Sequence, residues 1–165
     1  MRILLSLTAL GICLGACTGQ WEAAQDAFVR QAWEAPRGFT RTDPTGRVLE
    51  EDLDDWRTAP LFRGILLIHP PYPNPTRGED LRLPVEVLAF SGLSGGLEGW
   101  AADLQGRPVR LFRHGQFAGP GLYTIRFSLA VLAPNLNWAS LRGLHRVRIF
   151  DEQGRMVTYG DVMLE

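Results

Sequence analysis

The sequence predicts a mainly β protein, an antiparallel β-sandwich of about seven strands that follows a short amphipathic N-terminal helix. From Leu61 onward, short runs rich in Val, Ile, Leu and aromatic residues alternate with Gly, Pro and Asn, and no long helical pattern separates them. Within these runs apolar residues recur at every second position, as in Leu81, Leu83 and Val85. This period is typical of strands that bury one face.

The apolar runs place the expected strands at residues 64–69, 81–90, 97–102, 108–112, 122–129, 145–150 and 156–164. Two of the connections share one pattern, because residues 103–107 read DLQGR and residues 151–155 read DEQGR. In such a loop the Asp begins a type I turn, and the Gly takes the left-handed backbone conformation that closes the loop with a bulge. We therefore expect two hairpins here and no duplicated binding site.

Residues 21–34 predict the helix, because apolar side chains recur there at helical spacing: Trp21, Ala24, Phe28 and Ala32. Pro36 follows as a stop signal. We expect this apolar face to pack on the domain. The alternative is that its Trp and Phe lie in a membrane interface.

Residues 37–60 form a polar, broken segment that contains a turn at 43–46 and an acidic run at 50–55. As a helix, this run would place Leu49, Leu53 and Trp56 on one face and its carboxylates in solvent. It lacks the alternating acids and the central glycine of a calcium-binding loop. We therefore expect a solvated helical face.

The first residues of the chain predict export. Arg2 precedes an apolar run from Ile3 to Leu14, and two small residues follow it, which is the order of a signal peptide. As a helix the run would span about 18 Å, against about 30 Å for the hydrocarbon core of a bilayer. It is therefore too short for a permanent membrane span.

Residues 14–17 read LGAC and resemble the lipobox of bacterial lipoproteins. The resemblance implies that Leu14, Gly15 and Ala16 are recognised by the signal peptidase and that the chain is cut before Cys17. It also implies that the thiol of Cys17 receives a diacylglyceryl group. In well-studied Gram-negative sorting, an Asp directly after this cysteine retains a lipoprotein in the inner membrane, whereas this chain has Thr18. We therefore expect the outer membrane, in its periplasmic leaflet, with surface display as the alternative.

The composition limits which disulfides, partners and domains the mature chain can have. The chain has two cysteines; Cys13 leaves with the signal peptide and Cys17 is lipidated, so no disulfide is expected. The formal net charge of -1 gives no basic field for nucleic acid. The expected organisation is a signal peptide at 1–16, a lipid-anchored tether with short helices at 17–60 and one sandwich domain at 61–165.

The C-terminal part of the chain combines YPNP at 72–75, DLQGRPV at 103–109, AGPGLY at 118–123 and a closing strand. This combination resembles the immunoglobulin-like C-terminal domain of type IX secretion cargo, which is related in fold to the flagellar hook-cap domain. Over residues 72–165 the resemblance implies an immunoglobulin-like sandwich. Such cargo normally has a non-lipid signal and a lysine in its last strands, and this chain has no lysine. A secretion-associated sorting role stays an alternative.

Motifs of known catalytic sites are absent from the sequence. His69, His114 and His145 have neither the spacing nor the cysteine partners of a zinc site, and no G-x-S-x-G nucleophile motif occurs. Carboxylates such as Glu86 and Glu98 would need a cleft to act in glycoside hydrolysis, and small sandwiches seldom have one. We expect no catalytic residues, no cofactor and no metal.

Aromatic and amide side chains supply the candidate ligand contacts. Trp100 and Trp138, together with Asn135 and Asn137, could offer a glycan a stacking surface and hydrogen bonds, and Tyr123 could extend that surface. The alternative is that these aromatic residues belong to the core or anchor loops.

The expected protein is a non-enzymatic cell-envelope lipoprotein. Its expected partners are the membrane, reached through the N-terminal lipid, and another envelope protein, for which the sandwich serves as a structural or adaptor module. Nucleic acid is not an expected partner. Carbohydrate binding and a sorting-type domain are the alternatives.

Overall fold

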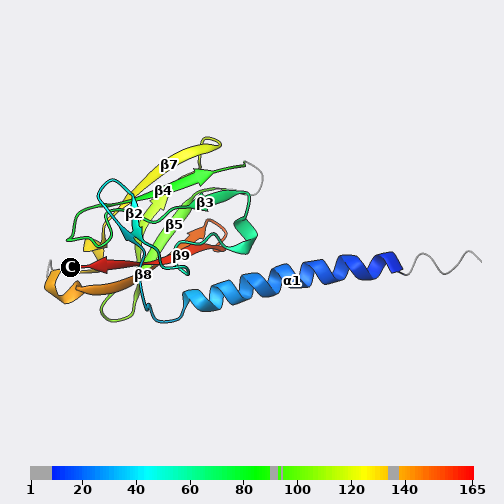
Figure 1. The fold of residues 1–165 in the computed structure, drawn as a ribbon, viewed down its shortest axis with the longest axis horizontal. Helices are drawn as coiled ribbons and strands as arrows, with labels where there is room; N and C mark the ends of the chain where they lie inside the picture. The colour runs from blue at the N-terminus through cyan, green and yellow to red at the C-terminus, as the bar shows by residue number, and fades with distance from the viewer. Residues whose placement is uncertain (1–8, 90–92, 94, 134–137) are drawn as a thin grey trace, which may run out of the picture.

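The computed structural model describes residues 9–89, 93, 95–133 and 138–165. The protein is mainly β, with antiparallel sheets consistent with a β-sandwich and one helix near the N-terminus, so the predicted fold class is confirmed (Figure 1). One sheet has the strand order β3-β4-β7, and its strands are Leu66–Ile68, Leu81–Val87 and Gly121–Phe127. The second large sheet has the order β6-β5-β8-β9, and its strands are Pro108–His114, Leu97–Ala102, Gly143–Asp151 and Met156–Leu164; a third, small sheet is described below.

The predicted strands occur in the predicted order, and β5 and β9 have the predicted bounds. Apolar residues at every second position of β4 and β8 point inward, and Leu83, Val85, Val147 and Ile149 are fully buried. Burial of such a side chain stabilises the fold by about 1.5–3 kcal/mol relative to its exposed state. The alternation of apolar residues predicted these strands correctly, because a strand that packs one face on the core places every second side chain there.

The expected DxxGR hairpin loops are confirmed at 103–107 and 151–155. In each loop the Asp N–H donates to the Arg carbonyl, and the Gly has a positive φ, 77° at Gly106 and 74° at Gly154. The turn at 43–47, which reads DPTGR, has the same hydrogen bonds and a φ of 90° at Gly46. In all three loops a carboxylate oxygen of the Asp accepts two backbone N–H groups of its own turn, which explains the preference for Asp.

The prediction of a solvated helix in the segment 37–60 is wrong. The segment instead contains the hairpin β1 (Arg41–Thr42) and β2 (Val48–Glu50), followed by turns. Leu53 is 79% exposed, whereas Trp56 is buried. The reason is long-range pairing, because the Trp56 N–H donates to Tyr159 O and the Ala59 N–H donates to Val157 O along the outer edge of β9.

The predicted N-terminal helix is present as α1 (Ala9–Ala32). It begins earlier than expected, because residues 9–20 belong to the same helix. Its C-terminal half packs on the outer face of the four-stranded sheet, where the rings of Phe28 and Tyr159 lie 5.0 Å apart. The packing expected of the apolar face therefore holds for Phe28, whereas Trp21 is 56% exposed. In the part of the chain that the structure describes, no helix is long and apolar enough to cross a membrane.

Candidate functional site

A groove of about 670 Å³ lies on the outer face of the four-stranded sheet. It runs beside the C-terminal end of α1, which Figure 1 shows against this sheet, and reaches the loops after β5 and β8. Its lining includes the aromatic side chains of Trp33 and Trp100 and the charged side chains of Glu98, Arg113, Arg148 and Glu152.

Strand alternation and register bring the groove residues together. In β5 and β8 the buried residues face the core, so Glu98, Trp100, Arg148 and Phe150 point to the opposite face. The antiparallel register sets Trp100 opposite Arg148 and Glu98 opposite Phe150. Directly opposed side chains of neighbouring strands are within contact distance, so these residues form one surface.

Ion pairs hold the outer rim of the groove. The carboxylate of Glu98 lies 3.5 Å from Arg110 and 3.4 Å from Arg113, and Arg113 also lies 3.9 Å from Glu152. The Arg110 guanidinium lies 5.8 Å from the centre of the Trp100 ring. Such exposed pairs stabilise a fold by at most about 1 kcal/mol each, but they restrict where the side chains point.

Arg148 is the charged residue at the inner wall of the groove. Its Nε donates a hydrogen bond of 2.8 Å to Ala32 O, and its guanidinium stacks 4.2 Å from the centre of the Trp33 ring. Burial lowers the pKa of Arg148 and a neighbouring positive charge, Arg146, lowers it further. Among the described residues no carboxylate lies within 4 Å of this guanidinium. Arg148 thus has a half-buried charge without an ion-pair partner in that part of the chain.

No family model, curated protein or solved structure matches this chain. The groove must therefore be interpreted from its own chemistry. Within the described residues no group of three or more His, Cys, Asp or Glu side chains could hold a metal ion.

The structure places one predicted ligand-contact residue in the groove, Trp100. Asn135 and Asn137 lie outside the described residues, and so does the side chain of Trp138, the first residue of the 3-10 helix Trp138–Leu141. Tyr123 is on β7 of the other sheet and hydrogen-bonds through its hydroxyl to Gly119.

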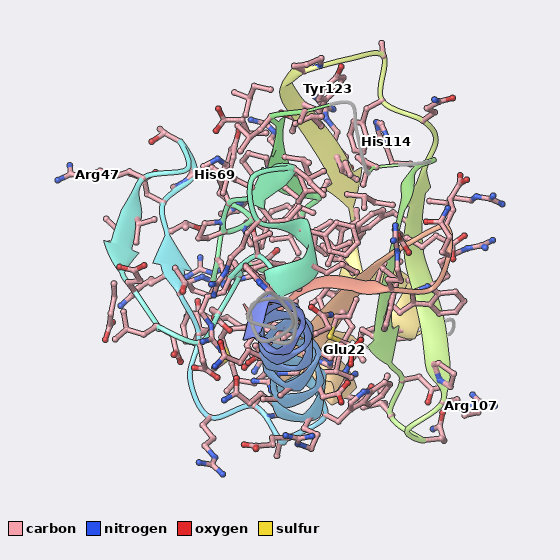
Figure 2. The ribbon with its side chains drawn as sticks, turned by 90° about the vertical axis from the view of Figure 1, so that its right-hand side faces the viewer. Glu22, Arg47, His69, Arg107, His114 and Tyr123 are labelled. Atoms are coloured by element: carbon pink, nitrogen blue, oxygen red, sulfur yellow. The ribbon has the colours of Figure 1, made fainter. Side chains whose placement is uncertain are left out.

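Figure 2 shows how far Tyr123 is from the groove. Tyr123 and His114 lie together at one end of the sandwich, and Arg107, in the β5–β6 loop that borders the groove, lies at the other end. Tyr123 therefore does not extend the Trp100 surface. Its hydroxyl instead anchors its own loop.

Trp33 and Arg148 are not among the residues predicted from the sequence. The outward direction of Arg148 follows from its place between Val147 and Ile149, which are both buried. Trp33 comes directly after the last residue of α1 and is 63% exposed. Only the packing of α1 on β8 makes the two side chains neighbours, and no local pattern encodes that packing.

For the predicted lipidation site, the structure describes the backbone alone. Residues 14–17, with Cys17 at their end, belong to α1. Their side chains lie outside the described residues.

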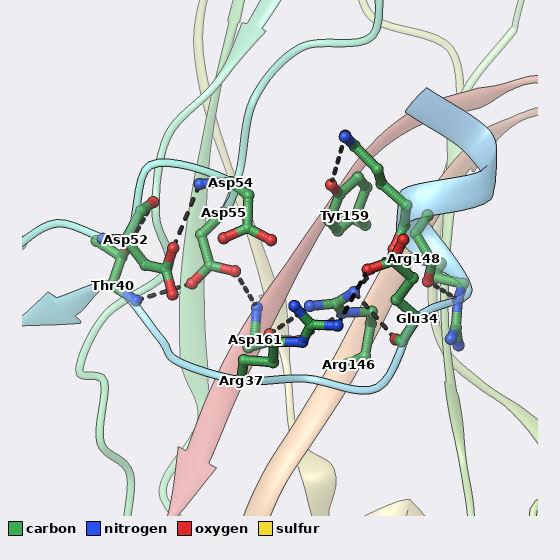
Figure 3. A network of polar contacts seen from close by, with 12 residues as sticks. Glu34, Arg37, Thr40, Asp52, Asp54, Asp55, Arg146, Arg148, Tyr159 and Asp161 are labelled. Atoms are coloured by element: carbon green, nitrogen blue, oxygen red, sulfur yellow. Dashed lines mark hydrogen bonds and ion pairs between the residues drawn. The ribbon is translucent and has the colours of Figure 1, made fainter. Parts of the chain in front are cut away.

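A buried polar network joins α1 to the sheet (Figure 3). Arg146 and Asp161 are paired across β8 and β9, and Arg146 donates to the two carboxylate oxygens at 2.8 and 2.6 Å. The Nη1 of Arg146 also donates to the carbonyls of Gln31 and Glu34 at 3.0 and 3.1 Å. Arginine side chains of β8 therefore add donors at the end of α1, where a helix leaves carbonyl groups without intrahelical partners; Gln31 O also accepts the Glu34 N–H at 3.1 Å.

Asp55 is the third charged member of this network and corrects the expectation of solvated acids. It is buried, and its carboxylate accepts N–H groups of Thr40 at 2.7 Å and of Asp161 at 2.9 Å. Burial raises the pKa of Asp55 to about 7, and the two N–H groups oppose that rise only in part.

We expect the free energy of unfolding to fall as the pH rises from 4 to 8. Folding raises the pKa of Asp55 from 3.8 to about 7. Between these two pH values the folded state therefore holds a proton that the unfolded state has lost. The resulting stabilisation is complete below pH 4 and lost as the pH rises through 7, and it amounts to at most about 4 kcal/mol. Urea unfolding followed by circular dichroism at several pH values measures it.

Asp55→Asn is the control for this titration. The amide cannot titrate, so the variant should lose this fall in stability between pH 4 and 8 while being less stable at pH 4, because its NH2 group would face an N–H donor. An unchanged pH profile in Asp55→Asn would assign the dependence to other groups.

Proposed function

We propose that this chain is a non-enzymatic envelope lipoprotein, anchored through Cys17, whose sandwich is a structural or adaptor module for another envelope protein. The observation that carries the proposal is the continuity of α1, which runs as one helix through Cys17 to Ala32. Gln25 of this helix already bonds to the domain, through Met156 O at 3.4 Å and the Leu61 N–H at 3.2 Å. Between Cys17 and Gln25 the helix rises only about 12 Å.

A continuous helix of this length suits a module that must stay at a set height above a bilayer. Trp21 and Leu61, which are 56% and 45% exposed, line one cleft between α1 and the 3-10 helix Pro60–Phe62. Tryptophan at the start of an anchored segment suits the headgroup region, where one end of the ring is apolar and the other polar. The sandwich would thus present the same faces to its partner in every molecule.

Cross-linking in intact cells tests the adaptor role. The wild type should cross-link to one defined envelope protein. Insertion of a flexible Gly-Ser segment of about twelve residues between Gly19 and Gln20 should abolish that product, because it removes the fixed distance. Cross-links that are unaffected by the insertion would contradict the fixed-distance function, and turnover of any substrate by the purified protein would contradict the non-enzymatic one.

The proposed location is the periplasmic leaflet of the outer membrane, on the basis of Thr18 after the lipidated cysteine. Protease added to whole cells should leave the domain intact, and the same protease should degrade it after the outer membrane is opened. Degradation in whole cells would instead indicate surface display.

Cys17→Ser should cause unprocessed precursor to accumulate, because the serine has no thiol to accept the diacylglyceryl group and the lipoprotein signal peptidase cuts only after that lipid is attached. The domain should fold with unchanged stability, since the mature chain has no other cysteine. Mass spectrometry of the wild type should show an N-terminal peptide that begins at Cys17 and carries lipid. A mature protein that begins elsewhere and carries no lipid would refute the anchor.

A further inference from the structure

We propose that the groove between Trp33 and Trp100 binds an acidic sugar, a uronic-acid ring of an oligosaccharide, whose carboxylate pairs with Arg148. This inference goes beyond the adaptor function and does not depend on it.

The size and the aromatic surface of the groove fit a short oligosaccharide. Its volume of about 670 Å³ is in the range of small-molecule sites, which is about 300–1,000 Å³. Trp33 and Trp100 enter it from the end of α1 and from β5. An indole has an electron-rich face, on which the C–H groups of a sugar ring can pack, and Trp33 has more than half of its surface open for such a contact.

The donors of Arg148 favour an anion. Its Nε is used by Ala32 O, and one face of its guanidinium is used by Trp33, so neither contact occupies the edge that carries the two Nη groups. Two parallel N–H groups on this edge match the two oxygens of a carboxylate. A half-buried cation without a carboxylate partner is unfavourable, and a bound anion would offset that cost.

The rim supplies groups for sugar hydroxyls. Glu98 and Glu152 are acceptors, and Arg113 between them is a donor, with all three already oriented by their mutual ion pairs. The carboxylates of the lining, Glu98, Glu152 and Asp151, are already paired with arginines, namely Arg110, Arg113 and Arg155. With Arg148 included, four arginines face three carboxylates, and Arg148 is the arginine left for a further anion. An acidic peptide would also bring carboxylates, but it would lack a flat ring surface for the two indoles.

Calorimetric titration of the full-length protein in detergent tests the proposal. The probes are oligogalacturonate, oligomannuronate and hyaluronan fragments, with a galacto-oligosaccharide of equal length as the neutral control and oligoglutamate as the peptide control. At least one acidic sugar should bind at least tenfold more tightly than both controls. Added salt should weaken that binding, because an ion pair contributes to it.

Matched variants assign the binding to the groove. Trp33→Ala and Trp100→Ala should each weaken the acidic sugar at least tenfold, whereas Trp21→Ala, which removes an exposed Trp outside the groove, should not. Arg148→Gln should reduce the acidic sugar to the affinity of the neutral one, and Arg148→Lys should be intermediate because it keeps the charge and loses the paired donors. Arg126→Gln, an exposed position on the other sheet, should have no effect.

Thermal unfolding of each variant separates a loss of binding from a loss of folding. Each of the two Trp variants removes a ring that is partly exposed, so its melting temperature should equal that of the wild type. Several results would overturn the proposal. These are the failure of all three acidic sugars to bind, equal affinity for the neutral sugar or the peptide, and binding that survives Trp100→Ala and Arg148→Gln in folded protein.

Discussion

Arg146→Met is expected to lower the free energy of unfolding by about 3–5 kcal/mol, which is the usual loss when one partner of a buried ion pair is removed. Asp161 is 1% exposed and would be left with an uncompensated charge next to Asp55. The carbonyl of Glu34, just after α1, would lose this donor as well, and that of Gln31 would keep only the N–H of Glu34. Urea unfolding followed by circular dichroism measures the loss.

Two further variants make this prediction specific. Arg126→Met removes an exposed arginine from β7 and should change stability by no more than about 0.5 kcal/mol. The double variant Arg146→Met with Asp161→Leu should recover much of the loss, since no charge is then left buried. Hydrogen exchange should also show faster exchange in the last turns of α1 in the single variant. A loss below 1 kcal/mol would mean that Arg146 does not hold the helix to the sheet.

The elements that were predictable from the sequence are those whose signal is local. Strands β4 and β8 have a two-residue apolar period that their own packing requires, and each DxxGR loop contains both the Asp that accepts the N–H groups of the turn and the Gly with positive φ. These features involve neighbours within five residues, so they can be read from the printed sequence. The same holds for the apolar face of α1 around Phe28.

The structure of the segment 37–60 differs from the prediction because the partners of this segment are distant in sequence. Its acidic run has helical spacing, yet Trp56 and Ala59 pair with β9, about a hundred residues later in the chain, and Asp55 bonds to Asp161. Backbone pairing with a sheet edge outweighs a local preference of a few tenths of a kcal/mol per residue. No local pattern shows that Asp55 is buried.

Of the candidate site, too, only the features with a local signal could be predicted from the sequence. Trp100 was identified as an aromatic residue of a strand, but Trp33 and Arg148 become its neighbours only through the packing of a helix on a sheet. The polar network between α1 and the sheet depends on contacts of the same separation in sequence, because Arg146 bonds to Gln31 across 115 residues. Long-range geometry therefore determines both features.

Asn74→Ala is expected to lower the free energy of unfolding by about 3 kcal/mol, since buried polar groups without partners each cost about 1–3 kcal/mol. Asn74 is fully buried in the YPNP segment. Its Nδ2 donates to Thr40 O at 2.8 Å and to Asp161 O at 3.0 Å, and its Oδ1 accepts the Met163 N–H at 3.0 Å. One side chain thus joins the first part of the segment 37–60 to β9. Thermal and urea unfolding measure the loss.

Asn74→Asp separates the hydrogen bonds of Asn74 from its volume. The carboxylate has almost the same size as the amide, but it would present an oxygen to two carbonyl oxygens that now accept from Nδ2, and it would bring a charge close to Asp161. We therefore expect Asn74→Asp to be at least as destabilising as Asn74→Ala, with the difference growing as the pH rises and the carboxylate ionises. Gln105→Ala, in the exposed β5–β6 turn, should change stability by no more than about 0.5 kcal/mol. If Asn74→Asp were as stable as the wild type, the amide would not be the link between the two segments, and packing of the YPNP residues alone would hold them.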